Sequence, residues 1–218
     1  MYKRQEYGSG LDNSERPWEE NRGIGMSFGF NRNETLEDYN SGKELVFMLA
    51  DIVSRGGNFL LDIGPTWDGR IPVIMEDRLI DIGEWLAVNG EAIYGTRAWA
   101  RSAQWTEGKR REVSTENNHG FHVFKDTIDP DPGYAFKEAL FTSKANDLYA
   151  MFHTWPADGV IRLRDIPVSK ATTVRLLGHG ESLAFSREGT DIAIELPQFV
   201  PGTAPGKYLW TLAISDIE

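Results

Sequence analysis

The stretch SRGGNFLLDIGP at residues 54–65 decides the fold. Two glycines precede an apolar run at residues 58–63, which is too apolar for a half-exposed strand and predicts a strand buried on both faces. One carboxylate, Asp62, interrupts this run near its end. In parallel sheets, polar residues at the carboxyl ends of strands face the active-site edge. Asp62 is therefore a candidate site residue; the alternative is a carboxylate that accepts backbone hydrogen bonds and orders the next turn.

Helical patterns flank this strand on both sides. The sequence SGKE at residues 41–44 is a capping box, and apolar residues follow it at helical spacing as far as Gly56, which supplies a left-handed stop. A second helix is predicted at about residues 75–88, after Pro72. Helix, buried strand and helix form the repeating unit of an α/β protein with a parallel sheet.

Beyond about residue 100 the period of the sequence changes to two, with Gly, Pro, Asn and Asp between the segments, as in an antiparallel sandwich. The predicted strands are residues 112–125, 137–142, 147–154, 160–164, 173–177, 182–186, 191–195 and 208–213. Another short strand is expected around residues 25–30. The sequence therefore predicts an α/β domain at residues 1–100 followed by an all-β domain at residues 101–218.

Composition excludes several classes of function. The net charge of −10 over 218 residues argues against a nucleic-acid partner or an anionic membrane surface. There is no cysteine, hence no disulfide framework and no thiolate metal site. No apolar run approaches the roughly 20 residues of a membrane span. The polar start, MYKRQEYGSG, is not a signal peptide, so a soluble protein of unassigned compartment is expected.

The remaining chemistry lies in carboxylates near aromatic rings. The four histidines lack zinc-motif spacing, and there is no phosphate loop or dinucleotide fingerprint, so no metal or cofactor is predicted. Acids beside aromatic residues suit carbohydrate chemistry, because an apolar wall raises an acid's pKa and rings stack on sugars. The acids are Glu6, Glu19 and Glu20, and the rings are Tyr7, Trp18 and Phe28.

Several ordered motifs together carry a resemblance to a known family. They are WE at residues 18–19, RGIGMSFGFN at 22–31, SRGGNFLLDIGP at 54–65 and NGEAIYGT at 89–96. From about residue 5 to residue 100 the chain closely resembles the C-terminal part of the catalytic domain in α-L-fucosidases of glycoside hydrolase family 29. The remainder looks like the family's C-terminal sandwich. The resemblance implies a partial (β/α)-barrel remnant followed by an antiparallel β-sandwich.

The resemblance also implies roles for individual residues. Gln5-Glu6-Tyr7 matches the segment that carries the family's acid/base, so Glu6 inherits that role, with Tyr7 as a substrate-binding candidate. Phe28 matches the ring that lines the pocket for the fucose methyl group. Trp18 and Glu19 match a pair beside the site. Where the family usually has Asn, this chain has Asp62.

The resemblance implies a retaining hydrolase with an aspartate nucleophile, and that nucleophile belongs to barrel strands that are expected before residue 1. A retaining glycosidase needs two carboxyl groups about 5–5.5 Å apart, and an inverting one about 6.5–9.5 Å. The candidates for a second carboxylate are Glu19, Glu20 and Asp62, or a residue of a neighbouring subunit.

A partial barrel leaves open strand edges and an apolar face, which favours assembly. We therefore expect a homo-oligomer that releases fucose from fucosylated glycans or small α-L-fucosides without a cofactor. The alternative is a non-catalytic fucose- or glycan-binding module, or an inactive fucosidase fragment. Turnover by the purified protein separates the two.

Overall fold

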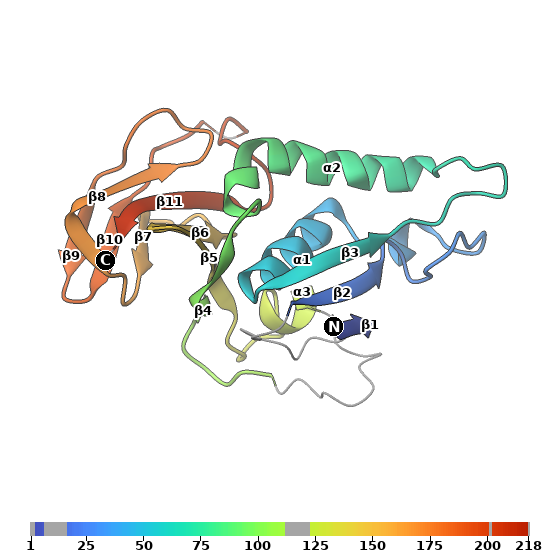
Figure 1. The fold of residues 1–218 in the computed structure, drawn as a ribbon, viewed down its shortest axis with the longest axis horizontal. Helices are drawn as coiled ribbons and strands as arrows, with labels where there is room; N and C mark the ends of the chain where they lie inside the picture. The colour runs from blue at the N-terminus through green and yellow to red at the C-terminus, as the bar shows by residue number, and fades with distance from the viewer. Residues whose placement is uncertain (1–2, 7–16, 112–122, 201, 218) are drawn as a thin grey trace.

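Helix α1 (Gly42–Ser54) lies between two β-sheets, and the other elements are arranged around it (Figure 1). Figure 1 shows a computed structural model that describes residues 3–6, 17–111, 123–200 and 202–217, with the backbone alone at residues 3–6 and 123. The sequence of layers is a parallel sheet, the helices, a large antiparallel sheet and a small one. In the described part of the chain, no helix has both the length and the apolar character needed to cross a membrane.

The parallel sheet contains three strands in the order β1-β2-β3. They are β1 (Lys3–Glu6), β2 (Trp18–Gly23) and β3 (Gly57–Asp62). Phe59 and Leu61 of β3 pack against the helices, as the apolar run predicts. Leu60, however, is exposed on the opposite face. The prediction of a strand buried on both faces is therefore wrong for this structure, since helices cover one face and leave the other open.

Helix α1 begins and ends as the sequence predicts. The Ser41 hydroxyl accepts a hydrogen bond from the Glu44 amide at 3.2 Å, and the Glu44 carboxylate accepts one from the Ser41 amide at 2.8 Å. Gly56 has φ of +82° just after the helix, which explains why glycine stops it. Apolar residues of α1 are buried almost all round the helix because sheets cover it on two sides.

The antiparallel sheet beside α1 has five strands in the order β4-β5-β6-β11-β8. They are β4 (Arg97–Trp105), β5 (Lys137–Lys144), β6 (Asp147–Phe152), β8 (Val168–Leu176) and β11 (Trp210–Ile217). In β5, Phe141 points to the sandwich core, whereas Leu140 packs on the helical side. The sheet is thus buried on both faces at its centre, which accounts for the nearly continuous apolar run of β6, whereas the edge strand β8 alternates buried and exposed residues.

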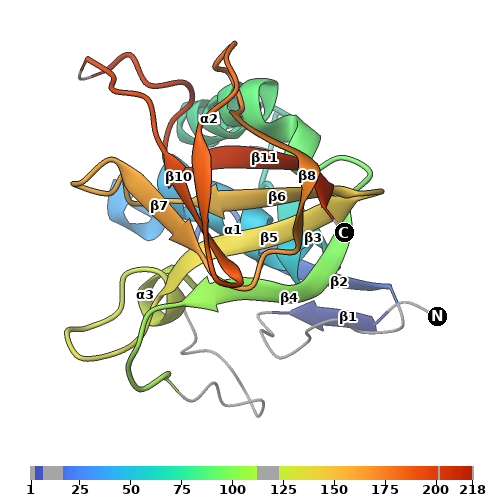
Figure 2. The same ribbon diagram turned by 90° about the vertical axis from the view of Figure 1, so that its left-hand side faces the viewer.

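A three-stranded antiparallel sheet completes the sandwich, in the order β7-β10-β9. Figure 2 labels two of its strands, β7 and β10. Its strands are β7 (Val160–Leu163), β9 (Phe185–Glu188) and β10 (Asp191–Glu195). Helix α2 (Val73–Asn89) lies along the parallel sheet and reaches the five-stranded one, where the Trp85 indole donates to the Leu209 carbonyl at 2.9 Å. The short helices are α3 (Val123–Thr127) and the 3-10 turns Leu36–Asp38 and Gly90–Ala92.

Two sequence-based expectations are corrected here. Residues 25–30 form no strand; Gly25 makes one isolated bridge to Tyr39, because side chains rather than a neighbouring strand bind this loop. The strand predicted at residues 112–125 lies mostly outside the described residues, and its last part is helix α3. Strand β4 runs across the predicted domain boundary at residue 100 and belongs to the five-stranded sheet.

A chain of buried charged groups joins the parallel sheet to the sandwich through α1. Glu20 of β2 accepts hydrogen bonds from Arg22 at 2.6 Å and from Arg55 at 3.2 Å. Arg55 also donates to Asp51 at 2.9 Å, and Asp51 forms an ion pair with Lys137 of β5. Burial by itself would raise the pKa of Asp51, but the opposite charges of Lys137 and Arg55 outweigh it and lower the pKa to about 2.

We expect Asp51→Asn to lower the free energy of unfolding at pH 7 by about 3–5 kcal/mol, since it removes the carboxylate that pairs with buried Lys137 and one of the two that pair with Arg55. The loss should shrink on acidification. A folded-state pKa of about 2 lies below the ordinary value of about 3.9, so the stabilisation is complete above pH ~4 and disappears as the pH falls towards 2. Urea unfolding at several pH values measures both effects.

The matched control for this prediction is Asp77→Asn. Asp77 pairs with Arg78 at 2.6 Å, but its side chain is 62% exposed. Such a surface pair contributes about 0–1 kcal/mol, so this variant should unfold almost like the wild type. Equal unfolding free energies for the two variants at pH 7 would contradict the role given to the buried network.

Candidate active site at the carboxyl edge of the parallel sheet

Three strands of the parallel sheet end at one edge, and their last residues are Glu6, Gly23 and Asp62. The register sets Glu6 across from Asn21, which pairs in turn with Leu60. Asp62 pairs with Gly23, two residues further towards the edge. The backbone therefore brings Glu6 and Asp62 to the same end of the sheet, where parallel-strand enzymes place their chemistry.

The loop after β2 is held by its own polar side chains. Glu34 accepts a hydrogen bond from the Ser27 amide at 2.7 Å, and the Asn31 side chain donates to the Ser27 hydroxyl at 3.1 Å. Asn40 donates to the Ile24 carbonyl at 3.1 Å and closes the base of the loop. Phe28 lies within this ordered loop and is half-buried.

The loops after β2 and β3 cross in close contact at Gly64. A Cβ atom at this position would lie 2.2 Å from the Phe30 amide nitrogen and 2.5 Å from the Gly29 carbonyl carbon. The glycine is needed here for space and not for an unusual backbone angle. The contact fixes the loop that carries Phe28 and Phe30 against the residues that follow Asp62.

Asp62 takes part in this edge through its backbone. Its carbonyl accepts a hydrogen bond from the Ile24 amide at 2.9 Å, which ties the end of β3 to the start of the loop after β2. The side chain is partly exposed, and within the described ranges no hydrogen bond or ion pair of its carboxylate is recorded. The arrangement leaves this carboxylate accessible at the edge.

The remaining candidates on β2 fall on two faces of the sheet. Trp18 and Glu20 are fully buried on the face that α1 covers; Trp18 packs on Met48 and Ile52, and Glu20 is engaged by the two arginines. Glu19 is half-buried on the other face and pairs in register with Asn58. The structure does not bring Trp18 or Glu20 to the edge that holds Asp62.

For the last two candidate residues, Glu6 and Tyr7, the structure describes no side chain. Glu6 lies in β1 by its backbone, and Tyr7 falls outside the described residues. In the described segments, no three His, Cys, Asp or Glu side chains are grouped closely enough to hold a metal ion.

Comparison with known proteins relates this architecture to one family. Residues 1–91 match the family model described as Alpha-L-fucosidase, and residues 126–215 match the Alpha-L-fucosidase C-terminal domain. The chain belongs to the α-L-fucosidase family. The human plasma α-L-fucosidase is 38% identical to it over 194 residues, which are 88% of this chain and 36% of that protein. The human tissue α-L-fucosidase is 32% identical, with 88% and 35% covered.

Solved members of the α-L-fucosidase family share the fold. A Thermotoga maritima α-fucosidase, solved in complex with a mechanism-based inhibitor, superposes with a TM-score of 0.73 at 34% identity and covers 98% of this chain and 42% of its own. The present chain thus spans little more than a third of the length of the curated relatives cited above. The matched portion contains the described edge of the parallel sheet and the sandwich.

The sequence does not predict one feature near the carboxyl edge of the parallel sheet. Thr66, Trp67 and Val73 line a cavity of about 560 Å³ together with Phe30 from the loop after β2. The turn signal Asp68-Gly69 was visible in the sequence, but its meeting with Phe30 depends on how two loops pack. Phe30 of one loop and Trp67 of the other therefore form an aromatic surface further from the strands than Asp62.

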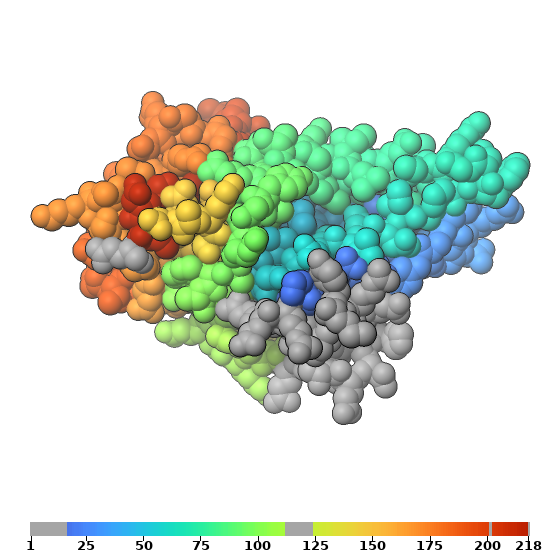
Figure 3. Space-filling view, viewed as in Figure 1, coloured from blue at the N-terminus to red at the C-terminus, as the bar shows by residue number. Residues whose placement is uncertain are grey.

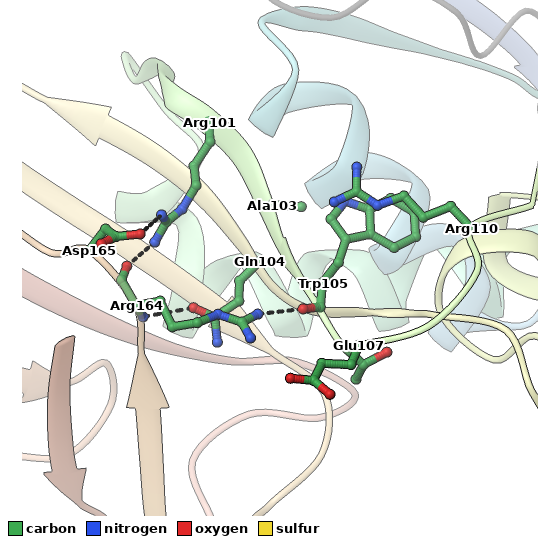
Figure 4. Close-up of a pocket in the computed structure, with 9 residues that line it drawn as sticks. Arg101, Ala103, Gln104, Trp105, Glu107, Arg110, Arg164 and Asp165 are labelled. Atoms are coloured by element: carbon green, nitrogen blue, oxygen red, sulfur yellow. Dashed lines mark hydrogen bonds and ion pairs between the residues drawn. The ribbon is translucent and has the colours of Figure 1, made fainter. Parts of the chain in front are cut away.

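A second pocket lies in the sandwich, and several of the residues that line it are joined by hydrogen bonds and an ion pair (Figure 4). The Arg164 guanidinium donates to the Trp105 carbonyl and to Glu138, and the Arg164 amide donates to Gln104 at 2.9 Å. Arg101 is paired with Asp165 at 3.7 Å. This network ties β4 to the end of β7, so we assign it to the sandwich structure and not to the active site.

The Gly64 contact gives a direct test of how the edge is held. We expect Gly64→Ala to cost about 1–3 kcal/mol of folding free energy, because a methyl group cannot fit against the backbone of Gly29 and Phe30. Gly83→Ala is the control: it lies in exposed α2 with open space around its Cβ position, so it should gain about 0.5–1 kcal/mol. Thermal unfolding of both variants checks the difference, and a neutral Gly64→Ala would refute the close crossing.

Proposed function

We propose that the protein hydrolyses α-L-fucosides and releases terminal α-L-fucose. The observation that carries this proposal is the common edge of β1, β2 and β3, where Glu6 and Asp62 end their strands in a chain of the α-L-fucosidase family. The substrate class follows from the family, whose solved members include an α-fucosidase bound to a mechanism-based inhibitor.

In this proposal Glu6 is the acid/base of a two-carboxylate mechanism. As the acid, it protonates the glycosidic oxygen while the bond between that oxygen and the anomeric carbon breaks. A second carboxylate stabilises the developing positive charge or bonds to the anomeric carbon. Glu6, now deprotonated, then takes a proton from water as the water attacks that carbon, which restores both carboxyl groups.

Strand geometry constrains the identity of the second carboxylate. Neighbouring strands are about 4.8 Å apart and residues rise about 3.3 Å each, so the Cα atoms of Glu6 and Asp62 are separated by about 12 Å. A retaining pair needs carboxyl groups about 5–5.5 Å apart, so this role for Asp62 requires the two side chains to reach several ångströms towards each other. Glu19 is on the adjacent strand at a Cα distance of about 8 Å by the same reasoning. Glu20 is engaged in buried ion pairs, so Asp62 and Glu19 are the preferred partners.

We expect Glu6→Gln to reduce the hydrolysis of 4-nitrophenyl α-L-fucoside by about 10²–10⁴-fold, because it removes the proton donor without changing side-chain size. Unchanged thermal unfolding of the variant would show that the fold is kept. Wild-type turnover by Glu6→Gln would disprove the assignment. Fucose binding by the unmutated protein without any turnover would favour a glycan-binding module instead.

Asp62→Asn distinguishes the two roles of Asp62. The variant restores the residue that the family resemblance leads us to expect at this position. Retained activity would assign Asp62 to loop ordering and make Glu19 the preferred partner, whereas a loss as large as that of Glu6→Gln would assign the second carboxylate to Asp62.

The open face of the parallel sheet leads us to infer a homo-oligomer. Leu60 is 38% exposed on a sheet type that is ordinarily covered on both faces, and β1 and β3 each pair with β2 alone among the described strands. A second copy that packs on this face would bury the leucine.

Sedimentation velocity should therefore show a species larger than the 24.6 kDa chain. Leu60→Glu should convert this species to the monomer, because the substitution buries a charged side chain in the proposed interface between the two copies. Ile80→Glu is a suitable control, since Ile80 is exposed on α2, away from the open face. A monodisperse wild-type monomer would be the contrary result.

A further inference from the structure

The most exposed tryptophan of the chain lies at the edge that holds Asp62. The side chain of Trp67 is 88% exposed, whereas Trp18 and Trp85 are fully buried and the other four tryptophans are partly buried. Burying a large apolar side chain contributes about 1.5–3 kcal/mol to stability, and the fold gains little of this from Trp67. The fold therefore leaves this indole free for contact with a ligand.

Trp67 is held outward by an ordered turn. The Gly69 amide donates to the Thr66 carbonyl at 2.9 Å, and Gly69 has φ of +82°, a left-handed angle that suits glycine. The Thr66 amide and hydroxyl both donate to the Arg70 carbonyl, at 2.8 and 3.0 Å. The ring is therefore presented by a hydrogen-bonded scaffold, which lowers the entropic cost of a contact with it.

The ring borders the cavity of about 560 Å³ between the loops after β2 and β3. These loops lie side by side at the right-hand end of the molecule (Figures 1 and 3). Phe30, itself 38% exposed, adds a second ring, and the same cavity is lined by Arg32 and by the ion pair of Arg70 with Asp68 at 3.2 Å, which supply hydrogen-bond donors and an acceptor. An apolar ring surface beside several donors is the lining expected for a sugar, whose pyranose has apolar faces and a rim of hydroxyl groups.

We propose that Trp67 forms a subsite for the sugar to which the fucose is attached, with the pyranose ring stacked on the indole. The inference rests on the proposed function, because it takes the fucose to bind beside Asp62. Thr66 follows Asp62 by four residues, and the cavity is lined by the two loops that leave β2 and β3 at that edge, so the group beyond the scissile bond would meet the indole.

The test compares two probes, 2′-fucosyllactose and methyl α-L-fucoside, on the wild type and Trp67→Ala. Dissociation constants come from isothermal titration of proteins that also carry Glu6→Gln, so that the probes are not hydrolysed; kcat/KM is measured in parallel by fucose release from proteins with Glu6 intact. Trp67→Ala should weaken the binding of 2′-fucosyllactose by about 3- to 10-fold, the size of one aromatic contact, and leave that of methyl α-L-fucoside unchanged. Trp67→Phe should recover most of the loss.

Leu36→Ala is the matched control, since Leu36 is 70% exposed in the loop after β2 but does not line the cavity. It should bind both probes as the wild type does. Equal weakening of both probes by Trp67→Ala, or no weakening of either, would overturn the subsite. So would a wild-type protein that binds neither probe, or a change in sedimentation without a change in binding. Selective binding without hydrolysis would uphold the subsite and refute the catalytic proposal alone.

Discussion

The buried ion-pair chain from Glu20 through Arg55 and Asp51 to Lys137 is the interaction on which the rest of the structure depends. It joins β2, α1 and β5, one element from each of three layers. Taking such groups out of water is costly, and the cost is offset only when each charge meets its partners in good geometry. The network therefore favours the one relative position of the sandwich and the parallel sheet in which all of these charges are paired.

Helix α1 turns this electrostatic constraint into a packing constraint. Its Met48 and Ile52 face the parallel sheet, while Val46, Phe47 and Ala50 pack towards the five-stranded sheet. The sandwich is thus not an appended module, because its large sheet shares a core with the helices of the α/β part. The carboxyl edge of β2 and β3 is positioned by both halves, even though none of the sandwich strands reaches it.

How far the sequence predicts this arrangement depends on the range of each interaction. The Ser41–Glu44 cap, the Gly56 stop and strand β3 follow from contacts within a few residues, and the structure bears them out. The sequence does not predict strands β1, β2 and the boundary-crossing β4, because each of them is paired with a strand that is distant in sequence. Leu60 was expected to be covered because its apolar neighbours suggest burial, but burial also requires a partner layer on that face.

The acidic pair on β2 shows why side-chain type alone could not select the site. Glu19 and Glu20 are adjacent and chemically alike, but alternation along a strand sends them to opposite faces. The sequence sets this alternation, yet only the packing of α1 decides which face meets Arg55. One glutamate is thereby used for docking the layers, and its neighbour lies on the opposite, open face of the sheet. Acidic residues on a parallel strand that already form ion pairs with the covering helix are therefore set aside first as candidates for catalysis. The distances between the remaining acids are compared afterwards.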